Sequence, residues 1–312
     1  MKNYSYAIIA DASCDLSDEL RARFEVDGYL KGCMSTPDAD DIEAQLNLSD
    51  AELDAFYASL KANKKGYKTS AISVDETISY FESFLQQGKD IIAISLTGKL
   101  SAVYSIMLHA KKIVCEKYPA RKVFVIDSMK YSAAVGLLTL KACELRAEGY
   151  TIEKNAEALE QHRKEIHHMG AIDDLFWVAS KGRISHAKAV FGSVAGIKPM
   201  GDFDSEGMVT VLAKVSGYDK AFKTTAEYIR RTIVSANEQR ILVAHSARRK
   251  QTEKLAELIR EHVKPKEVIV CNIYPFSGIN AGPGVIAAFY FGTEITDLKL
   301  EKEIIDDIIS KS

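Results

Sequence analysis

Short apolar runs that end in small polar residues recur along the chain. They occupy residues 6–10 (YAIIA), 90–96 (DIIAISL), 122–126 (KVFVI) and 240–244 (RILVA). Continuous apolar runs of this length are typical of strands buried on both faces of a sheet. Because each run leads into a helical pattern, the order predicts an α/β fold with a mostly parallel sheet.

Apolar spacing and end signals predict the helices that follow these strands. Ser73 and Glu76 form the pattern of a capping box, so a helix should begin near Val74, and Gly88 is a natural stop. Two further helices are predicted from residues that recur on one helical face: Val103, Met107, Ala110 and Val114, then Val135, Leu138, Ala142 and Leu145.

The pattern changes after about residue 165. Residues 201–207 read as the turn of a hairpin and 208–215 as its second strand, and 267–274 and 284–292 are further strands. We therefore expect two domains, an N-terminal α/β domain over 1–165 and a smaller C-terminal α/β domain over 166–312 with a partly antiparallel sheet.

Composition narrows the class of protein. The 312 residues are 47% hydrophobic and 27% charged with a net charge of −2, which fits a soluble globular protein and gives no basic excess for nucleic acid. The first apolar run meets Asp11 at once, so it is neither a signal peptide nor a membrane span. Five scattered cysteines without a C-x-x-C pair indicate a reduced, cytoplasmic protein with no zinc site, and no metal or cofactor motif is present.

Residues 91–105, IIAISLTGKLSAVYS, raise the question of a phosphate loop. That motif needs a glycine five positions before the Gly-Lys pair and a hydroxyl directly after the lysine. Ala93 and Leu100 stand at those two places. The spacing therefore argues against a nucleotide site.

The same turn keeps the features that hold an anion. Ser101 lies at the start of a predicted helix, where free N–H groups and the helix dipole favour negative charge. Thr69 lies just outside the predicted start of the helix near Val74, and Thr97 follows a predicted strand. These residues could converge with Ser101, because the carboxyl ends of parallel strands line the ligand crevice of such sheets. The alternative, that Ser101 and Ser128 are only helix caps, stays open.

An enzymatic function is the second hypothesis. His245 is the one histidine at a predicted strand end, so a hydrolase acting on acyl esters would use it with a strand-end serine. No G-x-S-x-G motif accompanies it. Asp11, Asp15 and Asp127 read as turn and cap residues, and Cys14 reads as a small buried side chain rather than a reactive thiol.

Residues 173–200 contain a dense apolar patch, at residues 175–178, that includes the only tryptophan. Leu175–Val178 (LFWV) precede a basic turn at residues 181–183, and Val190, Val194 and Ile197 repeat at helical spacing. These residues are either core packing or the apolar wall of a ligand tunnel.

Seven segments in this order resemble the DegV family of bacterial fatty-acid-binding proteins. They are IIADASCDL, KTSAIS, ISLTGKLSAVYS, VIDSMKYSAAVGLL, LFWVASKGRIS, GIKPM and NAGPG, and they span nearly the whole chain. The resemblance implies a two-domain α/β fold and one long-chain fatty acid, such as palmitate, in a tunnel between the domains. It implies no catalytic residues and no cofactor other than the bound lipid.

The resemblance also implies which residues hold the fatty-acid carboxylate. The family's threonine matches Thr69 and its serine matches Ser101, while Ser70, Thr97, Ser128 and Asn280 are possible further lining residues. Some family members present the fatty acid to a separate kinase for phospholipid synthesis, so a fatty acid kinase is an implied partner.

Several positions depart from the family pattern. Ala71-Ile72 and Ala102-Val103 replace polar or turn-forming residues near the expected head group. Ser216 and Asn280 stand where the family usually has arginine and histidine. These departures leave lipid binding as the first hypothesis and open two others, a member that binds a different amphiphile and an interaction module with an empty tunnel.

Overall fold

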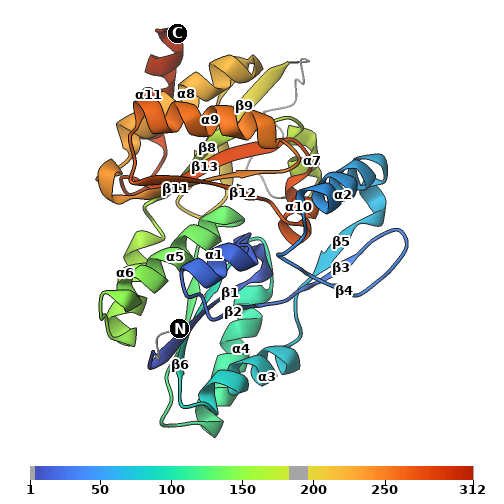
Figure 1. Cartoon of the computed structure of the whole chain (residues 1–312), viewed down its shortest axis with the longest axis vertical. Helices are drawn as coiled ribbons and strands as arrows, with labels where there is room; N and C mark the ends of the chain where they lie inside the picture. The colour runs from blue at the N-terminus through green and yellow to red at the C-terminus, as the bar shows by residue number, and fades with distance from the viewer. Residues whose placement is uncertain (1–3, 183–195, 312) are drawn as a thin grey trace. The chain divides into compact units, whose positions relative to one another are not determined.

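The computed structural model describes residues 4–182 and 196–311 and divides the chain into two compact units (Figure 1). The first unit comprises Met1–Ser49, Asn63–Arg163 and Tyr274–Ile279. The second unit comprises Asp50–Ala62, Lys164–Ile273 and Asn280–Ser312.

The main division falls between Arg163 and Lys164, and the sequence analysis placed a boundary after residue 165. Two short segments depart from the expectation of two continuous domains. Residues 50–62 belong to the second unit, and residues 274–279 belong to the first. Which unit a short segment joins depends on tertiary contacts, and local apolar patterning does not report them.

A four-stranded parallel sheet forms the centre of the first unit. Its order is β2-β1-β6-β7, with bounds β2 Gly28–Leu30, β1 Tyr6–Asp11, β6 Asp90–Ser95 and β7 Val123–Asp127. Three of these strands, β1, β6 and β7, lie at the apolar runs identified in the sequence. The predicted parallel α/β sheet is therefore confirmed.

Five α-helices of the first unit are α1 Asp18–Arg23, α3 Val74–Leu85, α4 Val103–Lys117, α5 Ala133–Ala147 and α6 Ile152–His162. The capping box predicted at α3 is present: Ser73 Oγ accepts the Glu76 N–H, and the Glu76 carboxylate accepts the Ser73 N–H. Gly88 follows α3 with a φ of 78°, a conformation that glycine adopts without strain.

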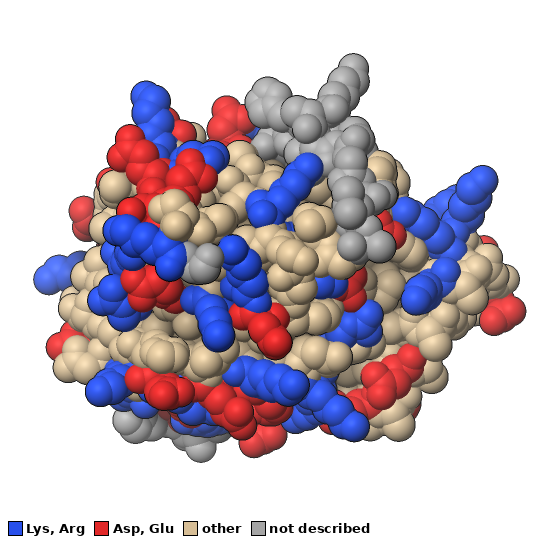
Figure 2. All heavy atoms as spheres, turned by 90° about the horizontal axis from the view of Figure 1, so that it is seen from above, with Lys and Arg blue, Asp and Glu red and all other residues tan. Residues whose placement is uncertain are grey.

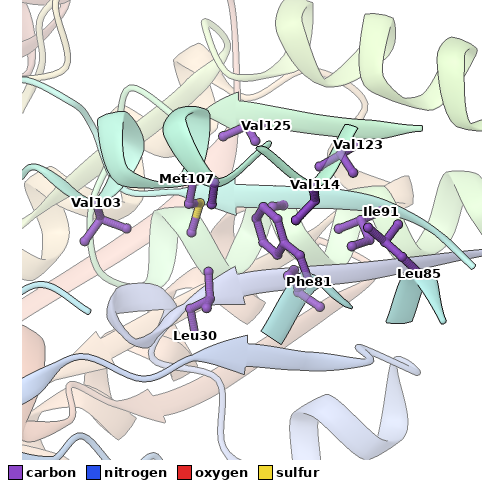
Figure 3. Packing of buried hydrophobic residues seen from close by; sticks show 12 residues of the cluster. Leu30, Phe81, Leu85, Ile91, Val103, Met107, Val114, Val123 and Val125 are labelled. Atoms are coloured by element: carbon purple, nitrogen blue, oxygen red, sulfur yellow. The ribbon is translucent and has the colours of Figure 1, made fainter. Parts of the chain in front are cut away.

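A hydrophobic cluster fills the space between α3, α4 and the parallel sheet (Figure 3). Phe81 and Met107 are fully buried and come from the two helices, and Ile91 comes from β6. The partly buried side chains that pack against the same cluster include Ala71, Ile72, Leu96 and Tyr104. In sequence, Ala71 and Ile72 lie just after Thr69, while Leu96 and Tyr104 lie before and after Ser101.

A small antiparallel sheet precedes α3 and was not predicted. Its order is β4-β3-β5, with bounds β4 Ile42–Glu43, β3 Cys33–Ser35 and β5 Lys68–Ser70. The strands are two or three residues long, too short to show an alternating pattern in the sequence. Thr69 lies on β5 opposite Met34.

The second unit contains a mixed sheet, as the sequence predicted. Its order is β12-β11-β13-β8, with bounds β12 Glu267–Asn272, β11 Arg240–His245, β13 Val285–Phe291 and β8 Ile166–Ile172. The pair β11–β12 is parallel, and β13 runs antiparallel to both β11 and β8.

A separate hairpin pairs β9 Ile197–Phe203 with β10 Val209–Ser216. The predicted turn over 201–207 was too long, because residues 201–203 belong to β9. Gly201 pairs with Val211, and a Cβ at Gly201 would lie 2.3 Å from the Thr210 carbonyl oxygen. This glycine allows close approach of two strands rather than a turn.

The helices of the second unit are α2 Asp50–Ala62, α7 Leu175–Ser180, α8 Gly217–Thr232, α9 Arg249–His262 and α11 Lys299–Ser310, while α10 Pro275–Ala281 crosses from the first unit. Two residues of α2, Tyr57 and Asp50, hydrogen-bond to other parts of this unit. The Tyr57 hydroxyl donates to the Ile273 carbonyl at 2.6 Å, and Asp50 accepts from Arg249 and Asn272.

No helix within the two described ranges is long and apolar enough to cross a membrane. On the face drawn in Figure 2, Lys and Arg side chains are interspersed with Asp and Glu. A surface of this kind does not form the basic stripe that nucleic-acid binding requires. Of the apolar stretch noted in the sequence, Val190 and Val194 lie outside the described residues.

Candidate functional site

The order of the parallel sheet marks a topological switch point. The connection from β1 leads to β2 on one side, and β6 and β7 lie on the other side of β1. In open α/β sheets a ligand crevice forms at such a point, beyond the carboxyl ends of the strands. The residues that follow β1 and β6 are therefore the first candidates, and they include the turn at residues 97–101.

The amides of this turn are mostly occupied within the protein. The Gly98 N–H donates to Asp127 Oδ2 at 3.2 Å, and the Lys99 N–H donates to Thr97 Oγ1 at 3.3 Å. The Leu100 N–H donates to the Thr97 carbonyl at 3.1 Å. A phosphate loop presents such amides to its ligand, so the geometry agrees with the rejection of that motif.

The start of α4 differs from those of α1, α3 and α6 and resembles that of α5, which also has no capping side chain and no acidic residue in its first turn. Side chains cap α1, α3 and α6, and each has an acidic residue in its first turn. At the start of α4 the N-cap residue, Ala102, has no side chain that could cap the helix, and the first turn has no acidic residue. Within the described ranges no acceptor faces the amides of Tyr104 and Ser105. This helix end keeps an uncompensated positive dipole.

Ser101 lies directly before this helix start, as predicted. Its Oγ accepts the N–H of Val103 at 3.3 Å. That contact uses the oxygen as an acceptor, so the hydroxyl hydrogen can be donated to an anion. The side chain is partly exposed, which leaves it reachable.

Thr69 lies on β5, shortly before two residues that pack against the hydrophobic cluster between α3, α4 and the parallel sheet. Its side chain is partly buried. Those two residues are Ala71 and Ile72. Leu96 and Tyr104, which lie on either side of Ser101 in sequence, pack against the same cluster. The structure therefore places the segments carrying Thr69 and Ser101 around one cluster within one unit.

The other predicted lining residues have different surroundings. Ser70 is exposed on β5. Thr97 and Ser128 are buried, and the Ser128 hydroxyl closes its own turn by donating to the Lys130 carbonyl and accepting the Lys130 N–H. Asn280 belongs to the second unit, near the end of α10. For these four residues a role in binding stays a prediction.

Two of the three aspartates near the sheet edge, Asp11 and Asp127, hold turns as expected, whereas the Asp15 carboxylate accepts from the distant Ser132 hydroxyl and Tyr274 N–H. Asp11 accepts the N–H groups of Ser13 and Leu96, and Asp127 accepts those of Gly98 and Met129. Burial raises the pKa of Asp11, and burial raises the pKa of Asp15 to about 7. Their oxygens are committed to backbone and hydroxyl donors, which suits structural carboxyl groups.

Groups that would support nucleophilic catalysis are poorly placed for it. Burial and the nearby Arg249 lower the pKa of His245 to about 4, so its ring is a weak base near neutral pH. The neighbouring Ser246 hydroxyl accepts the Val285 N–H at 2.8 Å instead of contacting a histidine. Burial raises the pKa of the Cys14 thiol to about 12, which disfavours the reactive thiolate.

Three quoted segments of the second unit meet at Asp173. Its carboxylate accepts from Lys198, from the Tyr218 hydroxyl and from Arg248. Gly284 lies against it, and the Asp173 N–H donates to the Gly284 carbonyl at 3.1 Å. Sequence reasoning did not single out Asp173, although LFWVASKGRIS follows it and GIKPM and NAGPG contain two of its neighbours.

The apolar patch at residues 175–178 forms most of α7. Trp177 and Val178 are buried, and Phe176 is 42% exposed. The Trp177 ring packs on Gly282 of the NAGPG segment. Burial of Trp177 and Val178 is compatible with both interpretations, core packing and the apolar wall of a ligand tunnel.

Among the residues that the structure describes, no group of three or more His, Cys, Asp or Glu side chains could hold a metal ion.

Comparison with known proteins places these features in a family. A family description for uncharacterised proteins of the DegV family matches residues 5–293. A DegV domain-containing protein from Clostridium perfringens is 28% identical over 289 residues, covering 92% of this chain and 97% of that protein.

Two solved structures share the fold. A stearic acid-binding protein from Eubacterium ventriosum matches with a TM-score of 0.80 and 19% identity, covering 93% of this chain and 99% of that one. The Streptococcus pneumoniae Fatty Acid Kinase (Fak) B3 protein, loaded with linoleic acid, matches with a TM-score of 0.77 and 21% identity. The match covers 92% of this chain and 99% of the Streptococcus pneumoniae chain.

Proposed function

The chain belongs to the DegV family, and from this premise we propose that it binds one long-chain fatty acid. The Thr69 and Ser101 hydroxyls donate to the carboxylate. The start of α4 carries the proposal, because it presents a hydroxyl and two amides without an acceptor and has no acidic residue in its first turn. An anionic head group would compensate that dipole.

The energetics suit a fatty acid. Burying one CH₂ contributes about 0.8 kcal/mol, so ~14 methylenes contribute roughly 11 kcal/mol before the costs of association. The head group then sets the orientation of the ligand rather than its affinity. Hydroxyl and amide donors do this without a buried ion pair, whose desolvation would offset its attraction.

The solved relatives support the ligand class. The Eubacterium ventriosum protein is described as binding stearic acid, and the Streptococcus pneumoniae protein carries linoleic acid. Both share the fold of this chain over more than nine-tenths of its length. A long-chain fatty acid is therefore the first ligand to test.

The protein acts in this proposal as a binding protein without catalytic residues of its own. It serves lipid transport or fatty acid metabolism, and a separate fatty acid kinase is the candidate partner. Ser216 and Asn280 replace the arginine and histidine expected from the family resemblance. Lipid binding does not depend on that partner, so the two are tested separately.

The decisive experiment compares Ser101→Ala with wild type. Native mass spectrometry of purified protein should show a one-to-one adduct that releases a long-chain fatty acid on extraction. After lipid removal, calorimetry with oleate should show affinity about ten-fold lower for Ser101→Ala, the effect of one hydrogen bond to a charged group.

Ser83→Ala is the matched control. Ser83 is an exposed helical serine on α3 whose hydroxyl donates to the Tyr80 carbonyl. Its replacement should leave oleate affinity unchanged. If wild-type protein carries no lipid and refuses both oleate and palmitate, the fatty-acid proposal is wrong, and a different amphiphile or an interaction module becomes the better hypothesis.

A further inference from the structure

His167 of β8 is fully buried in the second unit, and both of its ring nitrogens contact acceptors. Nδ1 lies 2.6 Å from Asp202 Oδ2, and Nε2 lies 2.8 Å from the Thr293 carbonyl oxygen. A neutral imidazole carries one N–H, whereas an imidazolium carries two. Because a backbone carbonyl and a carboxylate only accept, the two contacts together require a doubly protonated, positively charged ring.

The Asp202 carboxylate has the contacts of an ionised group. Its Oδ1 accepts the His168 N–H at 2.7 Å and the Phe203 N–H at 2.8 Å. Its Oδ2 accepts the Tyr228 hydroxyl at 2.9 Å in addition to the ring of His167. Donors on both oxygens suit a carboxylate that carries no proton of its own. His167 and Asp202 therefore form a buried pair of opposite charges joined by a charge-assisted hydrogen bond.

Other titratable groups surround this pair. They are His168 of β8, Tyr228 of α8, Tyr290 of β13, whose ring stacks on that of His167, and Glu301 of α11. Burial raises the pKa of both tyrosines, so they stay uncharged near neutral pH. Burial also raises the pKa of Glu301, which makes this carboxyl the second group to test.

Loss of one proton from His167 would break its contact with Thr293. A neutral ring keeps a single N–H, and the ionised Asp202 is a stronger acceptor than a backbone carbonyl. The lone pair of Nε2 would then face the Thr293 carbonyl oxygen, and two acceptors so close repel each other. Thr293 lies between β13 and α11, so the contact that breaks is the one that holds the segment leading into the C-terminal helix.

We propose that His167 is a proton-dependent latch on the segment from Thr293 to α11. The charged ring joins β8 and β9 to this segment, and the neutral ring releases it. The helix α11 packs against α8 and β10 and buries Ile305 and Ile308, so release of the segment loosens the covering of an apolar surface. The latch lies within the second unit and does not depend on the proposed fatty-acid function.

The latch weakens as pH rises. Burial by itself would lower the pKa of His167, but the charge of Asp202 and the hydrogen bonds to Asp202 and Thr293 raise it above the ordinary value of 6.5. When the latch opens, water reaches the ring and its pKa returns to about 6.5. Between these two pKa values opening releases a proton, so the opening equilibrium grows by up to about ten-fold for each pH unit.

NMR of protein labelled with ¹⁵N in its histidine rings tests the charged state directly. Triple-resonance assignment identifies the His167 signals in the wild-type chain, so this measurement needs no variant. The ring should carry a hydrogen on both nitrogens at low pH and lose one with a midpoint above pH 6.5. A midpoint at or below pH 6.5 would overturn the proposal.

Hydrogen exchange measured by mass spectrometry at about pH 7 and about pH 8 tests the release of the segment. Peptides from residues 293–311 are compared with peptides from α9 of the same molecule, because the intrinsic rate of amide exchange rises equally in both. Protection of residues 293–311 relative to α9 should fall by up to about ten-fold between the two conditions.

Two variants identify the titrating group. His167→Gln can still donate to Asp202 but cannot also reach Thr293, so residues 293–311 should be weakly protected at both pH values. Glu301→Gln removes the other buried acid and should keep the pH dependence of wild type. Relative protection of wild type that does not change with pH overturns the latch. A pH dependence that persists in His167→Gln and disappears in Glu301→Gln overturns the assignment to His167.

Discussion

Gly282 lies under the ring of Trp177 and shows how one residue limits the packing of the second unit. A Cβ at this position would lie 2.5 Å from Trp177 Cγ, and the backbone has a φ of 80°. Two requirements therefore coincide, because a side chain would clash and would also be strained. The glycine holds the NAGPG segment close to α7.

Gly282→Ala should lower the free energy of unfolding by about 3 kcal/mol, from the left-handed backbone and the clash together. Gly217→Ala is the control, since Gly217 has a φ of 74° with no atom within 4 Å of an added Cβ. Its cost should be about 1 kcal/mol. Urea denaturation measures both, and equal losses would contradict the packing argument.

Asp15 should make stability depend on pH. Burial raises its pKa from 3.8 to about 7. Between about pH 4 and pH 7 the folded state therefore holds a proton that the unfolded chain has released, and this group's contribution to stability falls as pH rises through that window. Asp15→Asn removes the titration.

Urea denaturation at about pH 5 and about pH 8 checks this effect. From the lower to the higher pH, the free energy of unfolding should fall less for Asp15→Asn than for wild type. Its absolute stability also reflects the loss of an acceptor for the Ser132 hydroxyl and the Tyr274 N–H, so the comparison uses the pH difference alone. Asp38→Asn, on an exposed turn, controls for the loss of one carboxyl group, and an unchanged pH difference in Asp15→Asn would refute the assignment.

Secondary-structure elements of the second unit are tied together by Asp202 of β9. The carboxylate accepts the His168 N–H of β8, the Tyr228 hydroxyl of α8 and the ring of His167 at 2.6 Å. The Asp202 charge raises the pKa of His167 although burial opposes this, and His167 in turn lowers the pKa of Asp202. One buried carboxylate thus joins three elements.

Asp202→Asn should destabilise the protein by about 3 kcal/mol, because it leaves buried donors without a charged acceptor. Asp204→Asn on the adjacent hairpin turn should cost about 1 kcal/mol, since that carboxylate accepts mainly from the exposed turn amides of Glu206 and Met208. Thermal unfolding of the two variants gives the comparison, and similar losses would argue against a central role for Asp202.

Elements with strong local signals were predicted well from the sequence. The start of α3 follows from Ser73 and Glu76, and strands β1, β6 and β7 of the parallel sheet follow from continuous apolar runs. Strand β8 was not predicted, although every residue of it is buried. A fully buried strand lacks the alternation that distinguishes it from a helix.

The candidate site was predicted only in part, for a related reason. Ser101 was located because a helix start is a local feature. The convergence at Asp173 arises from contacts between residues distant in sequence. No pattern within one segment reports such contacts.

At the scale of the whole molecule, the chain passes repeatedly between its two units. Residues 50–62 leave the first unit to join the second, and residues 274–279 return to the first. The Tyr57 hydroxyl binds Ile273 in the second unit, and the Tyr274 N–H binds Asp15 in the first. Neither unit is therefore complete as one continuous stretch.

A fragment of residues 164–312 should be less resistant to proteolysis than the same region in the intact protein. It lacks α2, whose Asp50 accepts from Arg249 and Asn272. Fusing residues 50–62 to the fragment through a flexible linker should restore part of the resistance to proteolysis. The same fusion with Tyr57→Phe should be less resistant than the fusion that keeps Tyr57. Equal resistance to proteolysis with and without α2 would contradict the assignment of α2 to the second unit.

The passage of the chain between units also limits how members of such a family can exchange parts. A chimeric gene with a single crossover near residue 163 joins α2 of one parent to the mixed sheet of the other. It likewise joins residues 274–279 of the second parent to the turn that carries Asp15 and Ser13 of the first. Functional recombinants should therefore need matched breakpoints around both short segments, so that inheritance follows three-dimensional neighbourhoods rather than halves of the gene.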